Sequence, residues 1–142
     1  MKHSILLLLC CCVTYFVIAQ KIESYKVPPA VKTSFARQYP DIKNTNWEIE
    51  NGQYEASFKD KSGSHSAVFA KDGAFIESEI DIKIDQLPAA SLDYMKVHYK
   101  TSSIREASKI TKADGTVNFE AAIKGKDIIF DEHGKFIKEA KD

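Results

Sequence analysis

The stretch Phe69-Ala-Lys-Asp-Gly-Ala-Phe-Ile76 returns 61 positions later in the chain as Phe130-Asp-Glu-His-Gly-Lys-Phe-Ile137. In each copy, apolar and aromatic residues flank a turn that contains glycine, which is typical of a strand, a tight turn and a second strand. Two copies at a fixed separation indicate that one structural unit has been duplicated in tandem. This duplication determines the architecture that we expect.

The rest of the chain repeats in the same order. Leu87-Pro-Ala-Ala90 matches Val27-Pro-Pro-Ala30 at a shift of 60, and Phe119-Glu-Ala-Ala-Ile123 matches Tyr54-Glu-Ala-Ser-Phe58 at a shift of 65. The shift changes only in turns, where insertions cost least. We therefore predict a first repeat over residues 27–85 and a second over residues 86–142, preceded by a short tail over residues 20–26.

Each repeat is predicted to begin with a helix and to continue with strands. In the first repeat Val27, Val31, Phe35 and Tyr39 recur every fourth residue, which places them on one face of a helix. Asn51-Gly52 then gives the strongest short-range hairpin signal, because both turn positions need a positive φ.

A two-residue turn at this point pairs Glu50 with Gln53, Ile49 with Tyr54, and Trp47 with Ala56. The same alternation continues through the later strands. We expect an α+β fold in which two tandem helix-plus-four-strand repeats form an antiparallel sheet of about eight strands. The helices pack on one face of the sheet, and the other face is open.

The N-terminal segment predicts export. A short basic start precedes an apolar run from Ile5 to Ile18, which is typical of a secretory signal peptide over residues 1–19, cleaved near Ala19. An uncleaved anchor and a lipoprotein signal are the alternatives. Lipidation is disfavoured because Leu9, rather than a small residue, precedes Cys10. We expect a periplasmic or secreted protein that is not inserted in the membrane after cleavage.

Charge and cysteine content exclude several kinds of function. The three cysteines all lie in the predicted signal peptide, so the mature chain has neither a disulfide framework nor a thiol nucleophile. The formal net charge is zero and the lysines are scattered, which argues against nucleic acid as a partner. Neither the oligomeric state nor the choice between periplasm and extracellular space follows from these properties.

Several short motifs resemble one known family. Val27-Pro-Pro-Ala-Val-Lys32, Asn44-Thr-Asn-Trp-Glu48, Asn51-Gly-Gln-Tyr-Glu-Ala56 and the two glycine hairpins are similar to the PepSY-like family of secreted bacterial proteins, also described as β-lactamase-inhibitor-like. The resemblance covers about residues 27–138 in two copies. It implies a helix-plus-four-strand unit, export, and a role in binding or inhibiting another protein. It supplies no active residues. Ala107 departs from the pattern near the position of Trp47.

No catalytic, metal or cofactor site is predicted. His133 occupies the turn position that Asp72 holds in the first copy, so turn chemistry accounts for it, and no two histidines have ligand spacing. Ser64 and His65 are adjacent on an extended segment and point to opposite faces. The glutamates of the strands fall on the solvated face of the sheet, where we expect ordinary acidity.

The glycine hairpins offer a candidate binding surface. A two-residue turn at Asp72-Gly73 directs Phe69 and Ile76 to the core and leaves Val68 and Phe75 on the polar face. In the second copy, the same turn leaves Ile129 and Phe136, the counterparts of Val68 and Phe75, on the polar face. We predict that these four apolar residues form a partner-binding patch.

Two alternatives remain at this point. The outward residues could be cross-strand pairs that only stabilise their hairpins. A turn longer by one residue would exchange the inward and outward positions.

Taken together, these patterns predict an exported, non-enzymatic binding module that contacts a protein or peptide through the open face of its sheet, with inhibition as one form of that role. The identity of the partner does not follow from the sequence. The alternative is a periplasmic carrier that holds a small apolar ligand between sheet and helices. An enzyme is the least favoured class, because no nucleophile, metal cluster or buried acid–base pair can be named.

Overall fold

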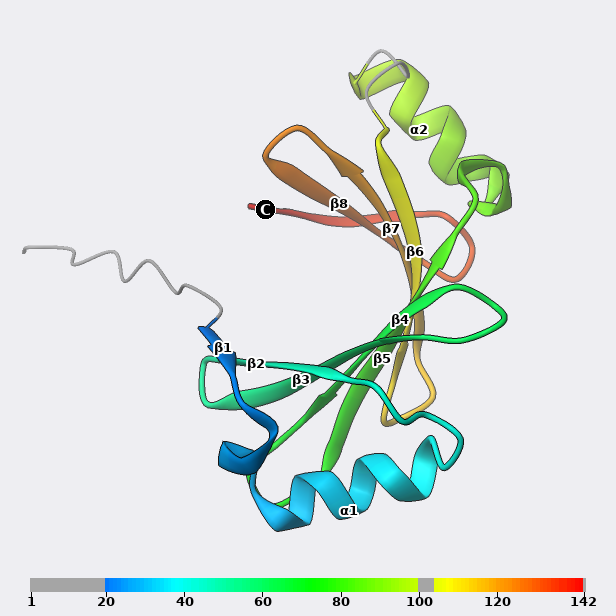
Figure 1. The fold of residues 1–142 in the computed structure, drawn as a ribbon. Helices are drawn as coiled ribbons and strands as arrows, with labels where there is room; N and C mark the ends of the chain where they lie inside the picture. The colour runs from blue at the N-terminus through cyan, green and yellow to red at the C-terminus, as the bar shows by residue number, and fades with distance from the viewer. Residues whose placement is uncertain (1–19, 100–103, 142) are drawn as a thin grey trace, which may run out of the picture.

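Within residues 20–99 and 104–141, which the computed structural model describes, nine antiparallel strands form a single sheet. The strands follow one another in the order β1 to β9, so each strand pairs only with its neighbours in sequence. Helices α1 and α2 lie on the outer side of the sheet, one beside each half (Figure 1). The predicted signal peptide lies outside the described residues.

The repeat predicted from the sequence is confirmed. Helix α1 and strands β2 to β5 form the first unit, and helix α2 and strands β6 to β9 form the second. The bounds are β1 Gln20–Ile22, η1 Ser24–Lys26, α1 Pro29–Gln38, β2 Asn46–Glu50, β3 Gln53–Lys59, β4 Ser64–Phe69, β5 Phe75–Ile82, η2 Ile84–Gln86, α2 Ala89–Tyr99, β6 Glu106–Lys112, β7 Val117–Ile123, β8 Lys126–Asp131 and β9 Phe136–Ala140.

One element was missed by the sequence analysis. The predicted tail over residues 20–26 contains strand β1 and the 3-10 turn η1. Strand β1 pairs with β2, and Ile22 lies opposite Trp47 and packs against the first core. Three residues without clear alternation give too little periodicity to predict a strand, so the sheet has one more strand than expected.

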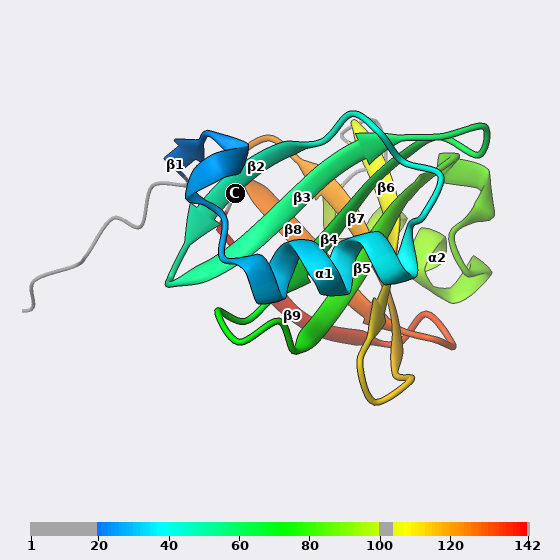
Figure 2. The same ribbon diagram turned by 60° about the horizontal axis from the view of Figure 1, so that its bottom comes forward.

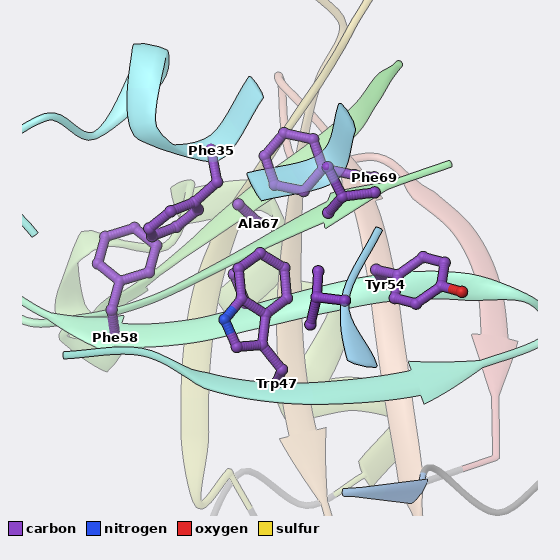
Figure 3. Packing of buried hydrophobic residues seen from close by; sticks show 9 residues of the cluster. Phe35, Trp47, Tyr54, Phe58, Ala67 and Phe69 are labelled. Carbon is purple, nitrogen blue, oxygen red and sulfur yellow. The ribbon is translucent and has the colours of Figure 1, made fainter. Parts of the chain in front are cut away.

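The predicted turn at Asn51-Gly52 is confirmed. Asn51 and Gly52 have φ values of 52° and 77°, and Trp47 pairs with Ala56 as the two-residue turn requires. This register points Trp47 and Phe58 toward α1. The ring of Phe35 on that helix meets those of Trp47 and Phe58 edge-on, at centroid distances of 5.4 and 5.3 Å (Figure 3).

A second core lies beneath α2, and β5 contributes to both cores. Met95, Ile128 and Phe130 are completely buried in the second core. At its two ends β5 packs against different cores, because Phe75 contacts the first and Ile82 contacts the second. The two repeats are therefore joined by a shared strand as well as by the continuous sheet, and Figure 2 shows β5 running behind α1 toward α2.

The glycine hairpins use a longer turn than the one we assumed. Ala70 donates its N–H to the Ala74 carbonyl, and Gly73 donates to Ala70, which closes a three-residue turn with Gly73 in the left-handed region. Phe69 therefore pairs with Phe75, and the register shifts by one residue beyond this pair. The second copy has the same turn, and there Phe130 pairs with Phe136.

Each hairpin glycine also touches the start of the helix in its own repeat. A Cβ atom placed on Gly73 would lie 2.7 Å from the carbonyl oxygen of Ala30, and one placed on Gly134 would lie 2.8 Å from the Ser91 nitrogen. Real Cβ atoms do not approach other atoms so closely. Glycine is required here both for the positive φ and for the contact between hairpin and helix.

The sheet curls so strongly that its helix-free side is concave. Ser108, Ile110, Asn118 and Ile129 alternate with the helix-facing residues of their strands, yet all four are buried. No described helix covers them. Their burial comes from the curl of the sheet, which brings β9 opposite β2 and β3 (Figure 1). The face that we predicted to be open is therefore partly enclosed.

Candidate functional site

The strongest candidate site is the concave face, by which we mean the helix-free side of the curled sheet. A hollow of about 620 Å³ lies where the two repeats face each other. A neighbouring hollow of about 600 Å³ continues along β3, β4 and β5. Both are lined by Glu55, Ser66 and Glu79, so these side chains lie at the middle of the face.

Strand register places carboxylates side by side on this face. Glu55 pairs with Val68, which pairs in turn with Glu77 on the next strand. Two strand spacings separate Glu55 from Glu77, which corresponds to about 10 Å between their backbones. Glu79 follows on the same face of β5, opposite Ser66. The three carboxylates therefore project into the same hollow.

Partial burial and mutual repulsion disfavour ionisation of the two central carboxyls. Burial is the largest cause that raises the pKa of Glu55, and the negative charges of Glu48, Glu50 and Glu77 raise it further, against a hydrogen bond from Ser66. Burial is also the largest cause that raises the pKa of Glu79, and repulsion from Glu55, Asp81 and Glu77 raises it further.

Our expectation of ordinary acidity on this face is therefore wrong for Glu55 and Glu79. A flat sheet would leave these carboxylates in water, where neighbouring charges are screened. The curl removes part of that water. Nothing in the alternation of a single strand reports how strongly the sheet will curl, so sequence reasoning did not find these two groups.

Acidic side chains outnumber basic ones on the concave face, although the whole chain is neutral. The alternation within each strand assigns the charged residues to this side. The acidic set is Glu48, Glu50, Glu55, Glu77, Glu79, Asp81, Glu106, Glu120, Asp127 and Asp131, and the basic set is Lys21, Lys59, Lys112 and Lys138. The face therefore carries a local negative field that the total charge conceals.

The structure separates the four residues of the predicted patch. Val68 and Ile129 lie on the concave face, Val68 half-buried and Ile129 buried. Phe75 and Phe136 face the helices instead. Phe75 packs on Phe69 at a centroid distance of 5.8 Å, and Phe136 stacks on Tyr94 at 4.9 Å.

The geometry predicted for Phe75 and Phe136 is wrong because the turn is one residue longer than assumed, as our second alternative allowed. The exposed apolar residue of the second hairpin is Ile137, with 48% of its surface accessible. That any of the four residues contacts a partner stays a prediction.

A cluster of Asp60, Ser62 and His65 occupies the loop between β3 and β4. The Nε2 atom of His65 lies 2.9 Å from both Asp60 Oδ1 and Ser62 Oγ. A Ser-His-acid triad needs the acid and the nucleophile on opposite ring nitrogens, so this cluster is not arranged as one. The hydrogen bonds of Ser62 to Asp60 lower the pKa of that carboxyl to about 2.

Sequence reasoning considered Ser64 as the neighbour of His65 and missed Ser62. The turn that brings Ser62 back to His65 is held by the Ser62 N–H, which donates to Asp60 at 2.7 Å. An aspartate two residues before a serine is the signal for such a turn. The cluster is therefore explained as loop structure.

Within residues 20–99 and 104–141, no group of three or more His, Cys, Asp and Glu side chains is arranged to hold a metal ion. Among the same residues, no helix is long and apolar enough to cross a membrane.

The family of the protein follows from the repeat and its sequence. The family model described as "Putative beta-lactamase-inhibitor-like, PepSY-like" matches residues 17–64 and 52–138 of this chain. The chain belongs to this PepSY-like family, and the presence of two matched regions is partly consistent with two copies of the unit. No match was found among the curated proteins.

Several solved structures share the fold. A protein of Bacteroides eggerthii described as a "putative periplasmic" protein is 15% identical, with 81% of this chain and 88% of that chain covered and a TM-score of 0.68. A DUF2874 family protein of Bacteroides uniformis is 16% identical, with 80% and 88% covered and a TM-score of 0.67. A BLIP-like protein of Bacteroides fragilis is 19% identical, with 79% and 84% covered and a TM-score of 0.63. At these identities the likeness shows the fold alone.

Proposed function

We propose that this protein is an exported, non-enzymatic binding module that contacts a protein or peptide through its concave face. The observation that carries the proposal is the partly buried cluster around Glu55 and Glu79, where burial and, to a smaller extent, neighbouring carboxylates disfavour ionisation. A structure gains nothing from such a cluster while it is empty. A cation placed among these groups would relieve the repulsion, so the cluster favours a positively charged partner.

The shape of the face favours a chain segment over a flat surface. The two adjoining hollows run along the concave side and are open at the surface, and Val68 lies between Glu55 and Glu77. We propose that an extended or looped segment rich in Lys or Arg lies along them, with aliphatic stems over Val68 and charged heads between the carboxylates.

The test uses a panel of unstructured peptides of equal length that are Lys-rich, neutral or Glu-rich, with binding followed by fluorescence anisotropy. We expect only the Lys-rich peptide to bind, and its affinity should fall steeply as salt is added. The double variant Glu55→Gln/Glu79→Gln should lose at least about tenfold in affinity, equivalent to about 1.4 kcal/mol.

The matched control is Asp93→Asn, which removes one exposed carboxylate from helix α2 on the other side of the sheet. The control removes one charge and the double variant removes two, so a loss of binding free energy in the control that is half that of the double variant would show that net charge alone is responsible. Equal binding of all three peptides would contradict the proposal.

Inhibition of an enzyme is one form that this binding could take, because the family and one of the solved structures are described as β-lactamase-inhibitor-like and BLIP-like. The direct test is hydrolysis of a chromogenic β-lactam by a purified β-lactamase, with and without an excess of this protein. A rate that falls with added protein and recovers with Glu55→Gln/Glu79→Gln supports an inhibitory role through the concave face. An unchanged rate would contradict inhibition of a β-lactamase. The binding proposal itself would then be decided by the peptide assay.

Export is the remaining part of the proposal. The apolar start of the chain and the description of the Bacteroides eggerthii protein support it. Expression of the full chain in a Gram-negative host, followed by fractionation and mass determination, should give a periplasmic or secreted product that begins near Gln20. A product that retains Met1 in the cytoplasm would contradict it.

A further inference from the structure

The two repeats differ most at one position of their cores. Trp47 on β2 lies between Ile22 on one side and Ala56 on the other. In the second repeat Ala107 on β6 lies between Ile82 and Ala121 in the same way. Ala56 and Ala121 are matched residues of the two copies, so Ala107 holds the place that an indole ring fills in the first repeat.

The indole of Trp47 is 5% exposed and meets the ring of Phe35 edge-on, so it closes the first core at this end. Ala107 supplies only a methyl group. Beside Ala107 lies a hollow of about 740 Å³, floored by Ile82, Leu92 and Ala107. The corresponding corner of the first repeat holds two separate depressions of about 450 and 480 Å³, and Trp47 lies in the wall of both.

At two further positions around the hollow, the second repeat has an apolar residue where the first repeat has a polar one. Ile84 on η2 stands where the first repeat has Ser24, and Leu92 on α2 stands where it has Lys32. Ile84 keeps 39% of its surface exposed, which is high for an isoleucine. One large residue has become small, which leaves one continuous hollow in the second repeat, and two polar residues have become apolar, which makes the wall of that hollow more apolar.

Charged residues surround this apolar floor. Lys83, Asp85 and Arg105 are exposed side chains that line the hollow, together with Asp81 and Glu106. Both signs are present, so the surroundings favour neither an anion nor a cation. Shape and apolar contact are left to select the ligand.

We propose that the hollow beside Ala107 binds a small, uncharged aromatic molecule of one or two fused rings, of the size of indole. The first repeat shows which shape this corner of the fold accommodates, because Trp47 places a fused ring there. The hollow shares Asp81 with the hollow along β3, β4 and β5 but contains none of Glu55, Ser66 and Glu79, so the two proposals can fail independently.

The experiment titrates the intact protein with indole and follows backbone amide signals by NMR. We expect saturable shifts confined to residues around the hollow, chiefly Ile82, Ile84, Leu92 and Ala107. Ala107→Trp, which copies the first repeat, should raise the dissociation constant at least about tenfold. Leu92→Lys copies the first repeat at a surface position and should weaken binding in the same direction, which keeps the test informative if Ala107→Trp does not fold.

The matched control is Lys32→Leu, which gives the first repeat the apolar wall of the second while Trp47 still fills the corner. It should leave the number of sites and the affinity unchanged. The proposal is overturned if wild type shows no saturable shifts up to the solubility of indole. It is also overturned if the shifts persist in a folded Ala107→Trp variant, since indole would then bind elsewhere.

Discussion

Gly73 and Gly134 combine two requirements that are usually met by different residues. Both have φ values above +80°, and both face the first turn of a helix at distances that leave no room for a Cβ atom. Gly115 has nearly the same φ as Gly73, 86° against 87°, but nothing lies within 4 Å of its added Cβ atom. The chain therefore contains its own control for separating backbone strain from the contact with the helix.

We expect Gly73→Ala to cost clearly more stability than Gly115→Ala. Gly115→Ala, the control, should lose about 1 kcal/mol of stability, because it introduces only the strain of a left-handed alanine. Gly73→Ala adds the displacement of α1 from the hairpin, for a total of about 3 kcal/mol. Urea denaturation at equal protein concentration measures both values. Equal losses in the two variants would show that the hairpin can withdraw from the helix without cost.

The corrected register makes a second prediction at residue scale. Phe136→Ala should destabilise the protein by about 2–3 kcal/mol, because Phe136 stacks on Tyr94 and packs against the second core. Ile137→Ala should change stability by no more than about 0.5 kcal/mol, since Ile137 is half exposed. Thermal unfolding monitored by circular dichroism compares the two. The opposite order would restore the two-residue turn that we first assumed.

The carboxyl of Glu79 gives a pH dependence with a definite sign. Partial burial raises its folded pKa above the ordinary value for a glutamate, so ionisation of Glu79 opposes folding, and this penalty is present at neutral pH. Glu79→Gln should therefore raise Tm at pH 7. The gain should shrink as pH falls through the raised pKa and vanish below about 4.5, where both states are protonated.

Glu139→Gln should behave in the opposite way. Hydrogen bonds from Lys126 and Tyr99 lower the pKa of Glu139, so its ionised form supports the fold at pH 7 and that support is lost on acidification. Differential scanning calorimetry of both variants between about pH 3 and 7 tests the pair, because the support from Glu139 is lost as the pH falls through its lowered pKa. A lower Tm for Glu79→Gln at pH 7 would contradict the cost of burying this carboxylate among like charges.

At the scale of elements, β1 is the least expected part of the fold. It pairs with β2, and Ile22 contributes to the first core. A chain that begins at Glu23 should be less stable than one that begins at Gln20, by about 1–2 kcal/mol for the loss of one partly buried isoleucine and an edge strand. Chemical denaturation of the two chains provides the measurement. Equal midpoints would mean that β1 adds pairing without stability.

The two turn sequences differed in how well they predicted the register of their hairpins. Asn51-Gly52 predicted its hairpin to the residue, because few sequences adopt two consecutive positive φ values. Asp72-Gly73 gave the right element and the wrong register, since an aspartate before glycine suits both a two-residue and a three-residue turn. The face of the sheet to which each following side chain points depends on that single residue, so the sequence analysis placed Phe75 and Phe136 on the wrong face.

The candidate site was harder to predict than the fold for a related reason. Glu55, Glu77 and Glu79 were correctly assigned to the helix-free face from period-two alternation. Their altered acidity depends on the curl of the whole sheet, which opposes β9 to β2 and β3. Similarly, the departure at Ala107 was visible in the sequence, but the neighbouring changes at Ile84 and Leu92 acquired meaning only when the hollow was seen.

For the whole molecule, the shared strand β5 implies that the repeats unfold together. Its two ends are packed in different cores, so neither repeat can open without disturbing the other. Trp47 is the single tryptophan and reports on the first repeat, whereas far-ultraviolet circular dichroism reports on both. We expect the two signals to give one coincident urea transition. Separate midpoints would show that the repeats are independent domains.

The order of the strands has a further consequence for how the chain acquires its structure. Every strand pairs only with strands next to it in sequence, so contacts close short loops and their entropic cost stays low. A chain emerging N-terminus first, from a ribosome or from a translocation channel, can add each strand to an existing edge as it appears. Among the described strands, each finds its pairing partner in the strand before it, so fewer unpaired edges are exposed to aggregation during synthesis.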